Sequence, residues 1–353
     1  MKLKKLYYML TLSLIMGLFI FSSVKAQPLS LTREQIIHYT PAWQGERLPD
    51  GRPKVSDELI ARLRHVAVTE AWGTLNSMTD ETEQGTLSFG ETRRNTYSNQ
   101  YHEGMKLMRD DVIITGRALT VQFMPYRPDL NGVIQVEGNS AGRKSPSQFT
   151  WGVEQLQSGD CYVANVAEGM LDASHIGDNV ATAIWHNSGN GAVVRGTIRD
   201  LPGILAVDPK FNIMVRDFKA QSNSSNSVAG INCPIQIGYV TVMPGDVVLA
   251  TREGVVFIPP QHVLAVVERS ERTRMQDAFA HNGVKEGRFS AREADGAFTP
   301  EMHIEFTQWL FDHAYDMAKM LEPEGRSEGA PAPEFILSFA RERQERYPAP
   351  NPR

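Results

Sequence analysis

The chain has 353 residues, of which 41% are hydrophobic and 22% are charged, with 28 Gly and 20 Pro. This composition is ordinary for a folded globular protein and excludes global disorder. The formal net charge of −5 argues against a protein that binds nucleic acid or an anionic membrane surface.

The first 26 residues have the layout of a secretory signal peptide. Three lysines precede an apolar run from Leu6 to Phe21, and a short segment of small residues then ends at Ala26. The run is shorter than the ~20 apolar residues that a membrane span needs, so a retained anchor is the weaker alternative. We therefore expect cleavage after Ala26, a mature chain that begins at Gln27 with a formal charge of −9, and export to the periplasm or the medium.

An N-terminal arm is predicted before the main domain. Thr32 is placed to cap a short helix, and a loop rich in Pro and Gly follows it. From Ser56-Asp57 onward, apolar residues recur at helical spacing, which predicts two helices or one bent helix to about Leu75. Residues 79–100 are polar and predict a surface excursion.

Strand patterns dominate the middle of the chain. Apolar and β-branched runs predict buried strands, with Gly116 marking a bulge in the first of them. A polar stretch rich in Gly and Ser at 137–149 separates the first strand from the second. The predicted strands cover 111–123, 161–166, 192–198, 234–242, 247–250 and 254–258.

Helices return after the last strand. Pro259-Pro260 is predicted to open a helix that stops near Gly283, and a further helix is expected from Thr299-Pro300 to about Leu321. A linker at 322–333 and a short helix at 334–346 complete the chain. Because strands and helices interleave in one core, we expect an α/β or α+β fold with helical additions at both ends.

Only two cysteines, Cys161 and Cys233, are present, which is too few for a disulfide scaffold. An oxidising compartment would permit one bridge between them. Two separate buried thiols are an equally good interpretation, and the spacing suggests no metal site.

Charged residues flank a helix and a strand in the segment 177–200. Asp178 is predicted to cap the helix over 179–187, whose first-turn N–H groups, those of Asn179 and Val180, favour an anion such as a carboxylate. Arg199-Asp200 follows the next strand, at the edge where α/β sheets place ligand sites. Because the strand would run back along the helix, Arg199-Asp200 would lie close to Asp178. This arrangement predicts a site for an anion and a metal. The alternative is a capping Asp and a surface ion pair.

Several motifs carry a resemblance to a known family. The Asp-x20-Arg-Asp spacing, the start Gly-Asp-Asn-Val-Ala-Thr-Ala of the helix, the stretch Arg-Asp-Leu-Pro-Gly-Ile over 199–204, and Met-Pro-Gly-Asp with Glu-Gly-Val-Val-Phe-Ile-Pro over 243–259 are similar to the RraA-like family. That family includes metal-dependent 4-hydroxy-4-methyl-2-oxoglutarate and 4-carboxy-4-hydroxy-2-oxoadipate aldolases and the regulator of ribonuclease activity A. The resemblance covers about residues 55–268, and the arm over 43–55 resembles the longer members.

The resemblance implies an architecture. It implies a three-layer β/β/α core, here with additional N- and C-terminal helices, assembled as homotrimers or hexamers with sites at subunit interfaces. On this basis we expect a signal peptide over 1–26, an arm over 27–55, a catalytic domain over 56–268 and a helical extension with a Pro-rich tail over 269–353.

The resemblance also implies a chemistry. Asp200 would ligate Mg²⁺ or Mn²⁺ directly or through water. Arg199 would bind the carboxylate or ketone oxygen of a small 2-oxo acid and stabilise its enolate, and Asp178 would orient Arg199 or a water on the metal. The amides of Asn179 and Val180 would hold the pyruvate carboxylate. The implied enzyme is a lyase, an aldolase or oxaloacetate decarboxylase, that releases pyruvate.

The roles of several other residues, and one alternative function, stay open. Glu168 follows a strand end and is a further candidate for contact with substrate or with a water on the metal. His175 is either a site residue or a turn residue. Arg195 and Thr251-Arg252 depart from residues that are often acidic in the family. A non-enzymatic binding or regulatory role, as in members that inhibit a ribonuclease, is the alternative function.

Overall fold

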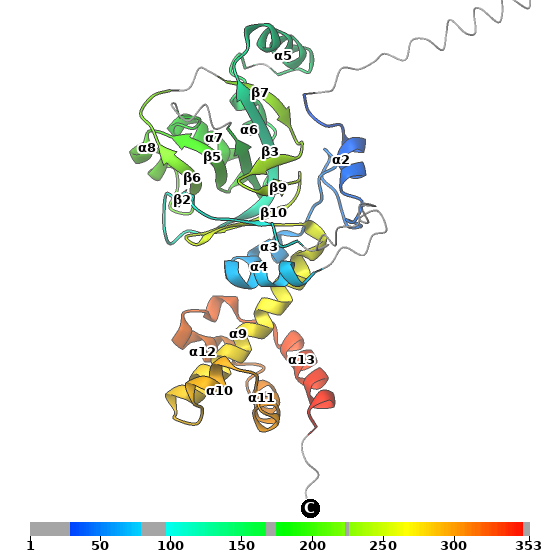
Figure 1. Ribbon diagram of the computed structural model, residues 1–353, viewed down its shortest axis with the longest axis vertical. Helices are drawn as coiled ribbons and strands as arrows, with labels where there is room; N and C mark the ends of the chain where they lie inside the picture. The colour runs from blue at the N-terminus through cyan, green and yellow to red at the C-terminus, as the bar shows by residue number, and fades with distance from the viewer. Residues whose placement is uncertain (1–28, 79–96, 144, 167–173, 223–225, 349–353) are drawn as a thin grey trace, which may run out of the picture.

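The computed structural model describes residues 29–348 apart from 79–96, 144, 167–173 and 223–225. Figure 1 shows a β-rich upper body and a helical lower body joined by the long helix α9. The strands are β1 (Tyr101–His102), β2 (Lys106–Leu107), β3 (Ile114–Pro125), β4 (Asp160–Asn165), β5 (Ala192–Ile198), β6 (Ile213–Phe218), β7 (Asn226–Ile231), β8 (Ile235–Ile237), β9 (Val240–Val242), β10 (Val247–Thr251) and β11 (Gly254–Ile258).

The main sheet has the strand order β1-β11-β10-β3-β4-β5-β6-β2, and β7 also pairs with β3. Its centre is parallel, because β3 pairs with β4, β4 with β5, and β5 with β6 in parallel. The flanking pairs are antiparallel. Three parallel pairs side by side bring the carboxyl ends of β4, β5 and β6 to one edge of the sheet, the edge at which such sheets bind ligands.

Alternate residues of β4 show two covering layers. Cys161 and Val163 pack with the β8–β9 hairpin, whereas Tyr162 and Ala164 pack with helices on the opposite face. Every side chain of β4 is buried, as expected for a parallel strand covered on both faces. The core is therefore a β/β/α sandwich, which confirms the predicted α/β class.

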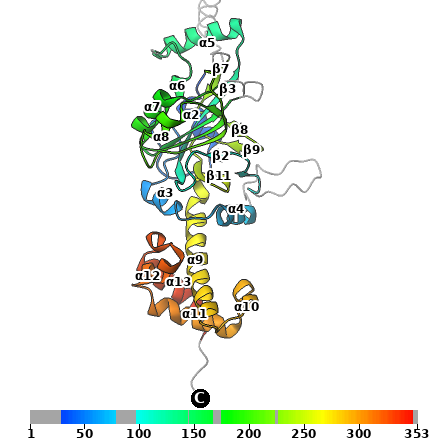
Figure 2. The ribbon, with the colours of Figure 1, turned by 90° about the vertical axis from the view of Figure 1, so that its left-hand side faces the viewer.

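The helices surround this core and form the lower body (Figures 1 and 2). Their bounds in the described residues are α2 (Arg33–Tyr39), α3 (Asp57–Leu63), α4 (Val68–Ser77), α5 (Pro128–Ser140), α6 (Thr150–Val153), α7 (Asp178–Ser188), α8 (Leu201–Leu205), α9 (Val263–Lys285), α10 (Ala291–Asp295), α11 (Pro300–Asp312), α12 (Met317–Leu321) and α13 (Pro333–Arg346), with short 3₁₀ turns at Pro260–His262, Glu322–Glu324 and Ser327–Gly329.

The N-terminal segment begins with the predicted helix capped by Thr32, and a buried ion pair holds it to the sheet. Thr32 caps α2 and forms a capping box with Gln35. Farther along, the Arg52 guanidinium donates to Asp160 Oδ2 at 2.8 Å, and both side chains are fully buried. Asp50 also accepts from Arg52. The arm thereby contacts the first residue of β4.

The helix α9 belongs to two hydrophobic clusters. Near its start, Val263, Val266 and Val267 pack with α3, α4 and the strands β10 and β11. Farther along, Met275 and Phe279 pack with α11, α12 and α13. The predicted domain limit at 268 lies inside this continuous helix.

The predicted helix limits in the helical extension hold in part. α9 continues two residues past Gly283, to Lys285, and a Cβ atom on Gly283 would meet the Phe289 ring. The next helix ends at Asp312 and a separate helix, α12, follows. In the break between them Tyr315 is 81% exposed.

Cys161 and Cys233 are both free thiols, and Cys161 is fully buried. Burial raises the pKa of Cys233 to about 11. In the described part of the chain, no helix has the length and apolar character needed to cross a membrane. The predicted signal peptide lies outside the described residues.

Candidate functional site

The segment before α7 lies beside the end of β5. Ile176 forms a parallel bridge with Ile198, and its carbonyl accepts from the N–H of Arg199 at 2.9 Å. The chain then enters α7 at Asp178, while β5 continues into Arg199 and Asp200. The helix and strand therefore return Arg199-Asp200 to the start of α7, as the sequence predicted, at the carboxyl edge of the parallel strands.

Asp178 is the first residue of α7, and Gly177 takes the N-cap position. This corrects the predicted cap by one residue. The Asp178 Oδ1 atom accepts from the N–H of Asn179 at 2.8 Å. An acid in the first helical turn interacts favourably with the helix dipole, so the position keeps the electrostatic role that a capping acid has.

Asp200 has a left-handed backbone, with φ 59° and ψ 37°. Asp200 and Asn232 are the only non-glycine residues with positive φ among those described. Such a conformation is costly for a residue with a Cβ, and strained residues gather at functional sites. It is Asp200 that the sequence predicts as a metal ligand.

Arg199 and Asp200 form a loose ion pair. Arg199 Nε lies 3.3 Å from Asp200 Oδ2, and the two side chains are 40% and 41% exposed. Because solvent screens a pair of this exposure, it contributes little stability. Both groups are thus available for contact with a ligand.

Two glycines make room for the two carboxylates. A Cβ atom on Gly177 would lie 2.8 Å from Asp200 Oδ2, and a Cβ atom on Gly203 would lie 2.7 Å from Asp178 Oδ2. Both distances are shorter than a normal contact. Each aspartate therefore lies against backbone of the segment that carries the other, which places the two acids around one small volume.

The first turn of α7 supplies donors to this volume. The N–H groups of Asn179 and Val180 stand where a helix has no internal partners for its donors. The Asn179 N–H is already bonded to Asp178, so a bound anion would share or displace that carboxylate. The side chain of Val180 packs against the core, which fixes the turn.

Glu168 and His175, the two other candidates from the sequence, are not part of the site as described. Glu168 lies outside the described residues. His175 is a core residue: it is buried between Phe123 and Phe149, and its Nε2 atom lies 3.2 Å from the Tyr162 hydroxyl. Burial lowers the pKa of His175 to about 3, so its imidazole is neutral.

The donor set suits a hydrated hard cation. No group of three or more His, Cys, Asp or Glu side chains that could hold a metal occurs among the described residues. Asp178 and Asp200 together offer two carboxylates, and Mg²⁺ is commonly bound by one or two carboxylates while it keeps several waters. The 41% exposure of Asp200 leaves space for those waters. The residues therefore fit Mg²⁺ or Mn²⁺.

Sequence reasoning missed the two glycines that shape the site. Gly177 was interpreted only as part of a helix start, and Gly203 only as part of a motif. Their signal was positional, because each immediately precedes or closely follows one of the acids. A short distance in sequence between a glycine and a functional acid is the pattern that could have identified them.

The comparisons with known proteins identify the family. The family model described as RraA-like, Aldolase/RraA, matches residues 57–257. Among curated proteins, the chain is 26% identical over 102 residues to a putative 4-hydroxy-4-methyl-2-oxoglutarate aldolase of Halalkalibacterium halodurans, a match that covers 29% of this chain and 48% of that protein. It is 27% identical over 120 residues to Protein DlpA of Legionella pneumophila, covering 34% of this chain and 19% of that protein. The matches thus span less than half the length of these relatives.

Solved structures share the fold. One is Streptomyces coelicolor RraAS2, described as an unusual member of the RNase ES inhibitor RraA protein family, with a TM-score of 0.50, 24% identity, and coverage of 65% of this chain and 98% of that one. Another is an uncharacterized protein of Pseudomonas syringae, with a TM-score of 0.52, 18% identity, and coverage of 71% and 99%. The family match spans more than half of the chain and includes the whole candidate site. This chain is therefore a member of the RraA-like family, a family that contains both metal-dependent aldolases and ribonuclease inhibitors.

Proposed function

We propose that this protein is a divalent-metal-dependent lyase that cleaves a carbon–carbon bond of a small 2-oxo acid and releases pyruvate. The observation that carries the proposal is the convergence of Asp178, Arg199 and Asp200 at the carboxyl edge of the parallel strands, with Asp200 in a left-handed conformation. Family membership and the putative aldolase among the relatives support it.

The two acids would hold the metal. Asp200 is the proposed direct or water-mediated ligand, and Asp178 the second carboxylate near it. Bound there, Mg²⁺ or Mn²⁺ would supply Lewis-acid polarisation of the 2-oxo group. The loose pairing of Arg199 with Asp200 leaves both charges accessible to a substrate.

Arg199 and the helix start would bind the organic acid. The guanidinium can donate to the carboxylate or to the ketone oxygen of the substrate, and it offsets negative charge as the enolate develops. The N–H groups of Asn179 and Val180 would receive the substrate carboxylate at the positive end of α7. A substrate carboxylate at these N–H groups would compete with Asp178 Oδ1 for the N–H of Asn179.

Two further features belong to the same proposal. We propose that the first 26 residues direct export, so that the enzyme acts in the periplasm or outside the cell. We also propose assembly into a homotrimer or hexamer, in which a neighbouring subunit borders the exposed side of Arg199 and Asp200.

The test is pyruvate release by the purified mature chain. The substrates are 4-hydroxy-4-methyl-2-oxoglutarate and oxaloacetate, each with Mg²⁺, with Mn²⁺ and with EDTA. We expect release with a metal, none with EDTA, and a loss of about a hundredfold or more in Asp200→Ala. The matched control is Asp208→Ala, an acid beyond α8 whose Oδ1 atom accepts from the N–H of Lys210.

A folded oligomer that releases no pyruvate from either acid under any metal would overturn the lyase proposal. The binding or regulatory alternative would then be favoured. Release that is unchanged in Asp200→Ala would instead move the active site elsewhere in the chain.

A further inference from the structure

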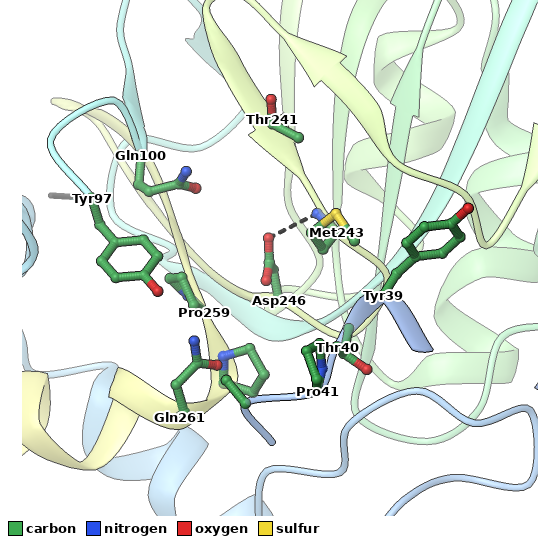
Figure 3. Close-up of a pocket in the computed structure, with 12 residues that line it drawn as sticks. Tyr39, Thr40, Pro41, Tyr97, Gln100, Thr241, Met243, Asp246, Pro259 and Gln261 are labelled. Atoms are coloured by element: carbon green, nitrogen blue, oxygen red, sulfur yellow. Dashed lines mark hydrogen bonds between the residues drawn. The ribbon is translucent and has the colours of Figure 1, made fainter. Parts of the chain in front are cut away.

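A cavity lies away from the candidate site, between the N-terminal arm and the sheet (Figure 3). Its volume is about 270 Å³, close to the lower limit of about 300 Å³ for small-molecule pockets. The lining residues come from the arm, the segment before β1, the strand β9, the turn before β10 and the 3₁₀ turn before α9: Tyr39, Thr40, Pro41, Ala42, Tyr97, Gln100, Thr241, Met243, Asp246, Pro259, Pro260 and Gln261.

This cavity is separate from the candidate lyase site. The carbonyl of Asp246 accepts from Ala118 N–H, and Ala118 pairs with Cys161 near the start of β4. Arg199 and Asp200, by contrast, follow the end of β5. The two places therefore lie at opposite ends of the parallel strands, and ligand binding in this cavity is independent of the proposed lyase activity.

Asp246 is the charged group of the cavity. It is 3% exposed, and its Oδ2 atom accepts from the Met243 N–H at 2.8 Å. Figure 3 shows its carboxyl group at the centre, between Gln100 and the Tyr39 ring. Among the described lining residues there is no Lys or Arg to neutralise it. Burial raises the pKa of Asp246 to about 7.

Two polar groups of the cavity are hydrogen-bond acceptors that a ligand with N–H donors could pair. The Oε1 atom of Gln100 is buried and has no hydrogen-bond partner. Leaving such an acceptor unpaired costs about 1–3 kcal/mol. A carboxyl group and an unpaired amide oxygen in one cavity are both satisfied by an N–H-rich ligand, and an ammonium group has three N–H donors and no acceptor.

The walls fit the organic part of such a ligand. The rings of Tyr39 and Tyr97 line the cavity, and an aromatic face attracts a cation within about 6 Å of its centroid. Prolines and Met243 supply apolar surface. We propose that this cavity binds a small organic ammonium ion, with its charged group on Asp246 and Gln100 and its apolar body against the tyrosine and proline walls.

The N-terminal arm makes the site possible. Tyr39 ends α2 and Thr40 to Ala42 follow it, so one wall of the cavity is built by the segment that the buried Arg52–Asp160 pair ties to β4. A chain without this arm would leave Asp246 open on that side. Ligand binding at Asp246 is thus a property that the arm adds to the sheet.

The experiment uses the full mature chain and benzylammonium as the probe, with benzyl alcohol as its neutral isostere, by isothermal titration calorimetry at pH 8. We expect benzylammonium to bind and benzyl alcohol to bind at least about tenfold more weakly, since one charge-assisted contact is worth roughly 1.4 kcal/mol or more. In Asp246→Asn the preference for the cation should disappear. Asp295→Asn, an exposed acid on α10, is the matched control and should bind as the wild type does.

The pH dependence gives an independent readout. The titratable groups lining the cavity are Asp246, Tyr39 and Tyr97, and His262 packs edge-on against Tyr97 at 4.6 Å between ring centroids. As pH falls below about 7, the Asp246 carboxyl takes up a proton, so benzylammonium affinity should fall by up to about tenfold per pH unit. A fall that persists in Asp246→Asn would assign the effect to a group other than Asp246 and count against the proposal.

Folding of the variants is verified by thermal denaturation. Asparagine keeps an oxygen that can accept from Met243 N–H, so Asp246→Asn is expected to fold. Should it fail to fold, Gln100→Met carries the test, with affinity expected to fall several-fold. No binding of benzylammonium at pH 8, or equal binding of the alcohol, would overturn the proposal.

Discussion

The Oδ2 atom of Asp200 lies 2.8 Å from the point that a Cβ atom on Gly177 would occupy. These two residues belong to different elements, the end of β5 and the start of α7. Their close approach is possible because Gly177 has no side chain, and it is what brings the two ends of the 177–200 segment together. Gly203 has the same relation to Asp178.

Alanine at either glycine should displace the facing carboxylate. Because a misplacement of about 1 Å can cost about a hundredfold in rate, we expect Gly177→Ala and Gly203→Ala to lower pyruvate release by ten- to a hundredfold, roughly. Gly73→Ala in α4 is the control, since a Cβ atom there meets nothing within 4 Å. That variant should keep full activity and gain about 0.5–1 kcal/mol of stability. Full activity in both site variants would show that the carboxylate positions are not critical.

The left-handed backbone at Asp200 should lower the stability of the protein, while its carboxylate is needed for pyruvate release. Both Asp200→Gly and Asp200→Ala remove the carboxylate and should lower pyruvate release by about a hundredfold or more. They should differ in stability, because a left-handed backbone costs a Cβ-bearing residue about 1–2 kcal/mol and costs glycine almost nothing. We expect urea denaturation to show Asp200→Gly to be more stable than Asp200→Ala by about 1 kcal/mol. Equal stability would mean that the backbone at position 200 relaxes when the acid is removed.

The buried Arg52–Asp160 pair should be essential for the arm. Arg52→Met leaves Asp160 buried without its main partner, which costs about 3–5 kcal/mol. The matched variant Lys54→Met lies two residues after Arg52 and breaks an exposed ion pair with Glu46. It should cost less than about 1 kcal/mol of stability. Chemical denaturation of the two variants beside the wild type measures both effects. Similar small losses would indicate that water enters and solvates Asp160.

The buried His175 should make the protein sensitive to acid. In the unfolded chain this imidazole takes up a proton below about pH 6.5, whereas burial keeps it neutral in the folded protein down to about pH 3. The unfolded state thus binds more protons in this window, and the free energy of unfolding falls as pH decreases, by up to about 1.4 kcal/mol per unit. His175→Phe should show a shallower fall between pH 6.5 and 4. Asp246 titrates with the opposite sign, but it is present in both proteins and cancels in the comparison. Parallel curves would contradict the assignment.

The sequence predicted the elements with strong patterns. The strand over 192–198, the strand over 254–258 and the helix after 333 all occur as expected, because apolar periodicity or capping residues mark them. The helix α5 was missed, since its glycines and asparagines resemble a loop and many of its apolar residues stay exposed.

The convergence at the candidate site was predicted only in part. Spacing along the chain indicated that Arg199-Asp200 returns to Asp178, because a helix and a strand of matching length reverse the chain. The left-handed turn at Asp200 and the glycine contacts depend on packing between α7 and α8, which no local pattern records. The cavity at Asp246 was missed for the same reason: its walls come from segments about 200 residues apart.

The length of the helix α9 affects how the helical extension is oriented relative to the sheet. Its 23 residues extend about 34 Å without a break, and side chains at its two ends belong to different hydrophobic clusters. Each residue of a helix turns it by about 100°. The number of residues between the two clusters therefore sets the rotation of one cluster relative to the other about the helix axis. One residue inserted at its midpoint would rotate the following part of the extension by about 100° about the helix axis and would break the contact between Gly329 and His65. The orientation of the extension therefore depends on the residue count of this helix, together with the contact that Gly329 makes with His65 beside α3.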